Sequence, residues 1–457
     1  MLTAFETALN TFADFMWGTP TVVLLVGGGL FLTVFSRLRA YRHFGHAIAL
    51  IAGRYDDEAS DGYVPHRQAL STALSGTLGL GNIAGVAIAI SSGGPGAVFW
   101  MWLTALVGIT TKFYTASLAV MYRGRDSAGL LRGGPMYVIR EGLPRRWYPL
   151  AVLFAAAGML GTLPLFQVNQ LVALLNHGLA EPLGLVEGRS VVFNLTCGLL
   201  IAAAVWAVVA GQIQRIGRTT VRLVPAMVLL YLAMTAVVLV EHAAQIPSLL
   251  LLIVNDAFSG ESVAGGIVGT TIMIGVRRGA FSNEAGIGTE SMAHGAARTA
   301  EPVREGLVAM TGPVIDTLIV CTCTALIILL TGTWQDGGGV EGVAMTADAV
   351  AQVLPRSGLY LMTLMVLLLS FSTVVSFWFY GAKCTGFLFG AQRQRFYTPV
   401  YIALIVLGSV ASLKLVNGLV IGMYAVMAIP TMLSTLVLAP RVNAAASRYF
   451  AGRPGGR

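Results

Sequence analysis

Small polar side chains and glycines are crowded into one apolar stretch of the chain, residues 72–87. Within it, Gly76, Gly79 and Gly81 are interleaved with side chains that can form hydrogen bonds, those of Ser75, Thr77 and Asn82. Each glycine costs about 1 kcal/mol of helix propensity relative to alanine. Backbone that leaves the helix at membrane depth is tolerated where it is buried in protein or lines a cavity. The stretch therefore predicts a helix broken inside the membrane, with backbone groups free to bind something small.

The chemistry of such a break suits a carboxylate and a cation. Unwinding near Gly79 would free the carbonyl groups of Ser75, Thr77 and Leu78 and the amide groups of Leu80 and Gly81. The positive end of the following half-helix favours a carboxylate, and carbonyl oxygens with the side chain of Asn82 suit Na⁺. A packing role stays open, because residues 81–85 form a GxxxG pattern that lets two helices approach closely.

Composition places the chain in a membrane. It has 457 residues, 56% hydrophobic and 11% charged, with a mean hydropathy of +0.76, whereas soluble proteins are about 25% charged. The net charge of +8 does not indicate nucleic-acid binding, because the basic residues fall in alternate loops, as the positive-inside rule requires. The larger basic set lies in the regions 37–67, 123–146, 215–222, 277–278, 298–304, 383–395 and 441–457. We therefore expect an N-terminus outside and a C-terminus in the cytoplasm, in the cell inner membrane.

About eleven apolar stretches are long enough to cross a hydrocarbon core of roughly 30 Å. They lie near residues 16–36, 69–91, 96–121, 149–177, 190–211, 219–240, 262–297, 306–332, 356–386, 398–413 and 416–440. The predicted organisation is a single polytopic transporter domain. It has an extra N-terminal helix at 16–36, five-helix units at 66–240 and 247–440, and a cytoplasmic tail at 441–457.

The second and seventh stretches are interrupted. The seventh has an apolar piece, Val263 to Val276, followed by a polar run from Arg277 to Gly288. Because the two stretches lie five spans apart, they cross the membrane in opposite directions and open two inverted five-helix units. Corresponding interrupted helices in two inverted halves are the best sequence indication of a transport site at the membrane midplane.

Two further spans carry candidate ligands. In the fourth, Gln167 is expected to face the substrate, with Asn169 and Gln170 as neighbours, although hydrogen bonding between helices is an equal alternative. In the ninth, Ser372 and Thr373 could complete a cation site and Phe377, one turn later, could wall a small pocket. These hydroxyls could equally satisfy their own backbone.

Other side chains narrow the class of protein. Buried charges are costly in membranes, and the chain has five of them in or near its spans, most near predicted cytoplasmic ends: Lys112, Glu284, Glu290, Asp316 and Lys383. An ion-pair network that forms a gate, or simple snorkelling, is therefore favoured over a proton relay. The sequence contains none of the common motifs of nucleophilic, zinc or phosphate-binding enzymes. An enzyme is therefore not expected. A channel is not expected either, because it would need a continuous polar lining and this chain has only one interrupted span in each half.

At these positions the chain resembles the alanine or glycine:cation symporter family. The motifs that carry the resemblance are Thr77–Ala87, Gly93–Trp102, Thr111–Phe113, Gly133–Tyr137, Arg278–Gly286, Pro302–Arg304 and Gly312–Thr317. The element Gly79–Asn82 also resembles the first broken helix of the neurotransmitter:sodium symporters. The resemblance implies an all-α membrane protein of about eleven helices, with a LeuT-like five-plus-five inverted repeat and one extra N-terminal helix.

The resemblance also implies residue roles. Asn82 and the carbonyl of Thr77 would serve one Na⁺ site, and the carbonyl of Leu78 with Ser372 and Thr373 a second. The substrate site would comprise Thr77, Gly79, Leu80, Gly81, Gln167, Thr373 and Phe377, with the amides of Leu80 and Gly81 holding the carboxylate. Family members often have Glu at the position of Thr115, and many have Trp and Glu at those of Phe377 and Ala382, so the pocket wall differs.

The predicted function is secondary active transport, in which Na⁺ drives uptake of a small neutral amino acid such as alanine or glycine by alternating access. No cofactor is expected beyond Na⁺ as the coupling ion, and membrane lipids are the expected surroundings. A proton-coupled carrier, or one for another small solute, is the alternative. The sequence predicts neither the oligomeric state nor the coupling stoichiometry.

Overall fold

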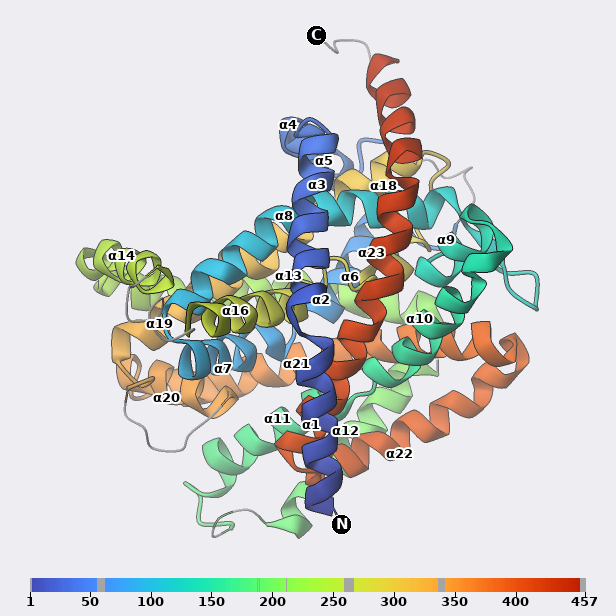
Figure 1. The fold of residues 1–457 in the computed structure, drawn as a ribbon. Coiled ribbons are helices and arrows are strands. Elements are labelled where there is room, and N and C mark those ends of the chain that lie inside the picture. Colours follow the sequence, from blue (N-terminus) through green and yellow to red (C-terminus); the bar gives the residue numbers. More distant parts are fainter. Residues whose placement is uncertain are drawn as a thin grey trace.

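Nearly all of the chain is helical in the computed structural model, which describes residues 2–55, 62–186, 188, 190–210, 212–258, 267–335 and 342–452. Within these residues, seven continuous helices and two bent helix pairs are long and apolar enough to cross a membrane. Figure 1 shows the N-terminal helices and the last helix as two long rods side by side. The prediction of an all-α membrane protein is therefore confirmed.

The chain begins with a bent pair of helices, α1 (Leu2–Met16) and the run α2 (Thr19–Val22) to α3 (Gly28–Phe35). The two parts meet at 47° beside Gly18 and Pro20, since proline favours the first turn of a new helix. The first helix pair therefore begins well before residue 16, the predicted start of the first span.

The helices of the first half follow in order. They are α4 (Arg39–Arg42), α5 (Phe44–Ile51), α6 (His66–Thr77), α7 (Ala84–Gly93), α8 (Gly96–Met121), α9 (Pro135–Gly142), α10 (Tyr148–Gly161), α11 (Leu165–Leu175), α12 (Val191–Val209) and α13 (Gln212–Glu241). Two short strands, β1 (Gly124–Arg125) and β2 (Leu131–Arg132), pair in antiparallel fashion before α9.

The second half repeats the theme of a broken helix near its start. Its helices are α14 (Ile246–Ala257), α16 (Ile267–Asn283), α17 (Thr289–His294), α18 (Pro302–Ala309), α19 (Thr322–Thr331), α20 (Val343–Val353), α21 (Gly358–Phe389), α22 (Tyr397–Val410) and α23 (Leu413–Ala451). A π-helical stretch, Val314–Cys321, joins α18 to α19 in one span. The predicted tail at 441–457 begins inside α23, which continues to Ala451, and residues 453–457 lie outside the described part.

The second break lies later in the chain than the sequence suggested. Helix α16 runs through Arg277 and Arg278 to Asn283, and the interruption occupies residues 284–288. Three residues there have positive φ, namely Glu284 at 55°, Gly286 at 81° and Gly288 at 97°, a conformation that glycine adopts most readily. Residues 262–266 of the predicted span lie outside the described residues.

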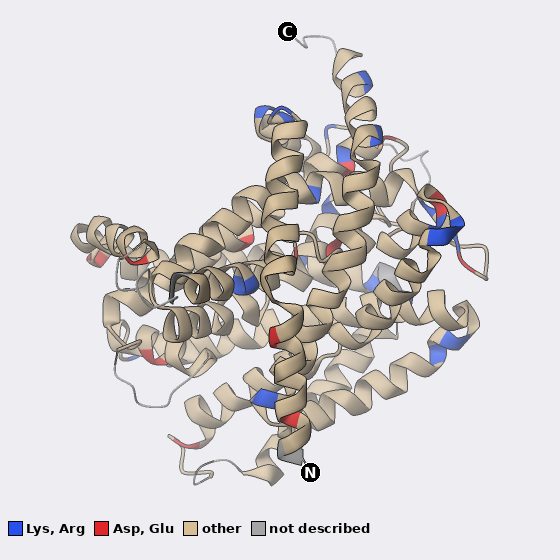
Figure 2. Cartoon of the chain, viewed as in Figure 1, with Lys and Arg blue, Asp and Glu red and all other residues tan. Residues whose placement is uncertain are grey.

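Charged residues are sorted between the two ends of the molecule. In Figure 2, Lys and Arg gather near α4, α9 and the turn between α21 and α22, while α14 and α20 carry acidic residues. We call the basic surface formed by α4, α9 and the turn between α21 and α22 the arginine-rich face. Arg277 is an exception to the predicted sorting, because it pairs with Asp14 of α1 at 2.8 Å, and Arg278 approaches Asn417 at the start of α23. Both therefore lie on the side opposite the arginine-rich face.

Candidate functional site

The first broken span has the geometry of an opened helix. Helix α6 ends at Thr77, a single turn of tighter helix covers Leu80–Asn82, and α7 begins at Ala84. The two parts of the span meet at 55°. The Gly79 N–H turns back to the carbonyl of Thr77 at 2.9 Å, so the carbonyl of Ser75 is released from its helical partner. The predicted break is therefore present where the glycines are densest.

Gly79 stands at the tightest point of this break. A Cβ atom there would lie 2.6 Å from the hydroxyl oxygen of Thr373 on α21 and 3.4 Å from Nε2 of Gln167 on α11. A Cβ at Gly85, in contrast, would meet nothing closer than the carbonyl oxygen of Leu80 at 4.0 Å. Gly85 is thus not needed for close helix packing, which argues against the GxxxG interpretation of this segment.

Hydroxyl groups of α21 form hydrogen bonds with the carbonyl and the side chain of Ser75 near the end of α6. Thr373 donates to the carbonyl of Ser75 at 2.9 Å, and Ser376 donates to the Ser75 hydroxyl at 2.8 Å. Ser372 and Thr373 also donate to the carbonyl of Leu369 in their own helix, each at 2.9 Å. Both interpretations of these hydroxyls therefore hold: they satisfy their own backbone, and Thr373 also contacts the break.

Three amide side chains of α11 divide between two tasks. The backbone amide of Leu80 donates to Oε1 of Gln167 at 3.2 Å. Asn169 donates to the carbonyl of Ala411 at 2.7 Å, and Gln170 accepts from the amide of Val343 at 3.2 Å. Asn169 and Gln170 thus hold the ends of neighbouring helices, and Gln167 is the amide that faces the break. Its oxygen occupies the place expected for a substrate carboxylate.

A carboxylate that the sequence analysis placed elsewhere lies beside Asn82. The Asn82 side-chain nitrogen donates to the carbonyl of Asp316 at 2.9 Å, and the Thr77 hydroxyl is a hydrogen-bonding neighbour of the Asp316 carboxylate. Asn82 Oδ1 and Asp316 Oδ2 are buried and have no partner among the described residues. Buried polar atoms are rarely left unpaired, so these two oxygens are candidate ligands for a cation.

Asp316 lies away from the helix ends near which most of the buried charges were expected. It lies in the middle of the span that runs from Pro302 to Thr331, close to Lys112 of α8. A buried acidic residue in mid-span was the only sequence signal available, since 234 residues separate it from Asn82.

The second break packs against the first. A Cβ at Gly81 would lie 3.4 Å from both Phe281 and Ser282 at the end of α16. The Phe281 ring contacts those of Phe166 and Tyr424, with centroid distances of 5.4 Å to each. These three aromatic residues form a wall beside the break that the sequence analysis did not assign. Phe377 instead packs on Tyr380, at 6.2 Å between centroids, and its role in a substrate pocket stays a prediction.

Two further buried acidic groups, Glu284 and Glu290, are held by hydroxyls. Tyr424 donates to Glu284 at 2.8 Å, and Thr289 donates to its other oxygen. Thr115 donates to Glu290 at 3.1 Å. The hydroxyl of Thr115 therefore satisfies one oxygen of the buried Glu290 carboxylate.

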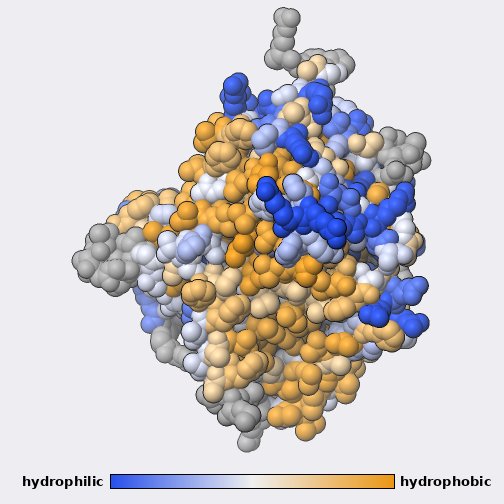
Figure 3. Space-filling view, turned by 45° about the vertical axis from the view of Figure 1, so that its right-hand side comes forward, coloured by the Kyte–Doolittle hydropathy of each residue, from blue (hydrophilic) through white to orange (hydrophobic). Residues whose placement is uncertain are grey.

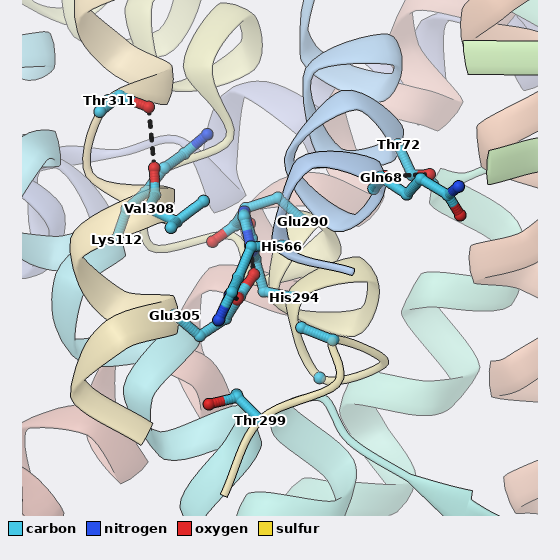
Figure 4. A network of polar contacts seen from close by, with 12 residues as sticks. His66, Gln68, Thr72, Lys112, Glu290, His294, Thr299, Glu305, Val308 and Thr311 are labelled. Carbon is cyan, nitrogen blue, oxygen red and sulfur yellow. Dashed lines mark hydrogen bonds and ion pairs between the residues drawn. The ribbon is translucent and has the colours of Figure 1, made fainter. Parts of the chain in front are cut away.

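A buried histidine–glutamate cluster joins the two broken spans on the side of the arginine-rich face. Glu305 of α18 accepts hydrogen bonds from Nδ1 of His66, at the start of α6, and from Nδ1 of His294, at the end of α17, the latter at 2.6 Å. Figure 4 shows the carboxylate between the two rings. The amide of Arg298 adds a bond to the carbonyl of Val64 at 2.7 Å. Helix α6 of the first broken span and helix α17 of the second are thus tied together through Glu305.

Replacing Glu305 with alanine should lower the stability of the folded protein. Each hydrogen bond to a charged group contributes about 1.5–3 kcal/mol, and the variant loses two. We expect the melting temperature in detergent to fall by at least about 3 °C. The control is Glu301→Ala, which removes only a helix-capping bond to the amide of Val303. Equal melting temperatures for the two variants would contradict a structural role for the cluster.

Comparisons with known proteins agree on one family. The model of the sodium:alanine symporter family matches residues 2–456. The chain is 37% identical to the sodium/alanine symporter AgcS of Methanococcus maripaludis, covering 95% of each protein. It is 32% identical to the probable sodium/glutamine symporter GlnT of Bacillus subtilis, covering 97% of this chain and 90% of that one.

A solved structure shows the same fold. The crystal structure of MhsT in complex with L-phenylalanine superimposes with a TM-score of 0.58 at 14% identity, covering 84% of this chain and 98% of that one. This similarity confirms the LeuT-like fold predicted above.

Proposed function

We propose that this chain, which belongs to the sodium:alanine symporter family, uses an inward Na⁺ gradient to take up a small neutral amino acid, alanine or glycine first. Because it belongs to that family, it is a membrane transporter and not an enzyme. The observation that carries this proposal is the break after Thr77. There Gly79 is enclosed by Thr373 and Gln167, and unpartnered oxygens of Asn82 and Asp316 lie beside it. A small ligand and a cation would share this site.

The proposed substrate pocket follows from the groups at the break. The carboxylate of the amino acid would bind the amides of Leu80 and Gly81, and the Gln167 side chain, released from Leu80, would turn to contact the bound amino acid. Thr77, Gly79 and Thr373 would surround it, and Phe377 would close the pocket as α21 moves. Alanine stands first because the chain matches the sodium:alanine symporter family, and glycine follows as the smaller neutral amino acid.

Two Na⁺ sites are proposed. The first would use the Asn82 oxygen and the Thr77 carbonyl, with the Asp316 carboxylate as an added ligand, because hard cations prefer oxygen ligands. The second would use the carbonyl of Leu78 with Ser372 and Thr373. Each elementary charge moved down 100 mV supplies about 2.3 kcal/mol, enough to concentrate a neutral solute more than tenfold.

Transport by alternating access would then require the two broken spans to separate on one side at a time. We place the arginine-rich face and the C-terminus in the cytoplasm, following the positive-inside rule, and the N-terminus outside, in the cell inner membrane. The bonds among His66, His294 and Glu305 would close the cytoplasmic side and would have to break for release.

Uptake of labelled L-alanine and glycine into proteoliposomes tests the proposal. At fixed pH, we expect accumulation only with an inward Na⁺ gradient and competition by small neutral amino acids. Uptake driven by a proton gradient without Na⁺ would overturn the choice of coupling ion. Failure of folded protein to accumulate either amino acid would overturn the choice of substrate.

Replacing Gln167 with leucine should weaken substrate binding at the break. The variant loses the side chain that contacts Leu80, and a buried hydrogen bond of this kind contributes about 0.5–1.5 kcal/mol. We expect the half-saturating alanine concentration to rise at least about threefold. Gln170→Leu, three residues along the same helix, removes an equivalent bond to Val343 and should leave that concentration unchanged. A larger effect at Gln170 than at Gln167 would show that the wrong amide was chosen.

A further inference from the structure

A cavity of about 360 Å³ opens at the arginine-rich face, away from the break. It lies between the second half of α21, the short helical turn η7 (Ala391–Phe396), the start of α22 and the end of α12. Three basic side chains line it, Arg132, Lys383 and Arg395, together with the amides of Gln392 and Gln394 and no acidic residue. Its volume falls within the range of about 300–1,000 Å³ typical of ligand pockets.

Lys383 is the deepest of these cations. Its side chain is only 3% exposed, and its ammonium group donates to the carbonyl of Met292 at 2.7 Å and lies 4.5 Å from the centre of the Phe379 ring. Within the described part of the chain it takes part in no ion pair. A buried charge that no carboxylate balances is costly, so the cavity is suited to an anion that would approach this ammonium group from outside.

The nearest acidic side chain is already engaged. Asp126 accepts from Nε of Arg132 at 2.9 Å. Burial acts to raise the pKa of Asp126, but hydrogen bonds from Arg132 and from the amides of Leu130 and Ala128 outweigh it and hold that pKa below its ordinary value. Asp126 is therefore ionised near neutral pH and neutralises Arg132, which leaves Lys383 and Arg395 without a balancing charge inside the cavity.

The mouth of the cavity lies at the border between basic and apolar surface. Arg395 is exposed, and Phe396, the next residue, is 58% exposed. Trp206 of α12, one turn before Val209 in the cavity wall, is 59% exposed. Figure 3 shows blue side chains bordering a broad hydrophobic surface on this side of the molecule. Such a border marks the level of lipid headgroups.

We propose that this cavity binds the phosphate group of an anionic phospholipid, with Lys383 and Arg395 contacting the phosphate and Gln392 donating to its oxygens. Basic pockets between membrane helices on the cytoplasmic side bind such headgroups, and the acyl chains would leave along the apolar surface near Trp206 and Phe396. The proposal concerns a site separate from the break and does not depend on which solute is transported.

The test is the thermal stability of detergent-solubilised protein titrated with dioleoyl phosphatidylglycerol, with dioleoyl phosphatidylcholine and with inorganic phosphate. We expect phosphatidylglycerol alone to raise the melting temperature in a saturable way. Lys383→Met and Arg395→Gln should each weaken the apparent affinity by about fivefold. Ala382→Glu, which places a carboxylate in the cavity wall, should abolish the response while the protein still folds.

Arg393→Gln is the matched control, because Arg393 lies on the same turn but lines a neighbouring apolar groove instead of the cavity. It should respond like the unmodified protein. Equal weakening by Arg393→Gln and Arg395→Gln would overturn the proposal and show a diffuse attraction to the basic face. A response to inorganic phosphate equal to that to lipid would support the anion site but overturn its assignment to a lipid.

Discussion

Alanine at position 79 should abolish amino-acid uptake. The new Cβ would lie 2.6 Å from the Thr373 hydroxyl oxygen, and Thr373 cannot easily move because it also bonds the carbonyls of Ser75 and Leu369. Overpacking of a tight site costs about 1–3 kcal/mol, which corresponds to a roughly ten- to hundredfold loss of uptake. Initial rates of alanine uptake into proteoliposomes, normalised to folded protein, measure the effect.

Gly85→Ala is the control in the same broken span. Because its Cβ would meet nothing closer than 4.0 Å, and alanine favours a helix over glycine by about 1 kcal/mol, uptake should stay near the wild-type rate. The double variant Gly79→Ala, Thr373→Ala removes the clashing hydroxyl and should recover the melting temperature that Gly79→Ala loses. Equal losses of uptake at positions 79 and 85 would contradict a specific site at Gly79 and favour helix packing.

Asn82→Ala and Asp316→Asn should each weaken the dependence of uptake on Na⁺. Each variant removes a side-chain oxygen that is a proposed cation ligand, and these oxygens are buried without a partner among the described residues. Asn82→Ala also removes the hydrogen bond to the Asp316 carbonyl. We expect the half-saturating Na⁺ concentration to rise about tenfold or more, as a loss of about 1–3 kcal/mol implies. Alanine uptake measured across a series of Na⁺ concentrations gives this value.

Asn194→Ala is a matched control for the asparagine change. Asn194 of α12 is also buried, but it accepts a bond from Asn176 at 3.3 Å, far from the break. Its loss should reduce stability without moving the Na⁺ concentration for half-maximal uptake. Unchanged Na⁺ dependence in both Asn82→Ala and Asp316→Asn would exclude a cation site between them.

Local properties of the chain predicted much of this architecture. Hydropathy marks the membrane spans, and the density of glycine around Gly79 marks the first break, because both depend on residues that are neighbours in sequence. The second break shows the limit. Arg277 and Arg278 suggested an interruption, yet α16 continues through them, because Asp14 and Asn417, 263 and 139 residues away, provide their contacts.

The composition of the site was also visible in part. The sequence indicated the glycines, Asn82, Gln167 and the hydroxyls of α21, since polar groups in apolar spans are costly and stand out. It did not separate Gln167 from Gln170, which lie on the same helix and differ only in the partner that packing supplies. It also did not place Asp316 at the break.

The sequence by itself thus determined the membrane class, the helices and the first break, whereas the tertiary structure decided which polar groups meet. Helix formation and membrane insertion follow from side chains near one another in the chain. A binding site instead follows from distances between residues hundreds of positions apart, such as Asn82 and Asp316 or Gly79 and Thr373. Only the packing of α6, α11, α21 and the span of Asp316 fixes those distances.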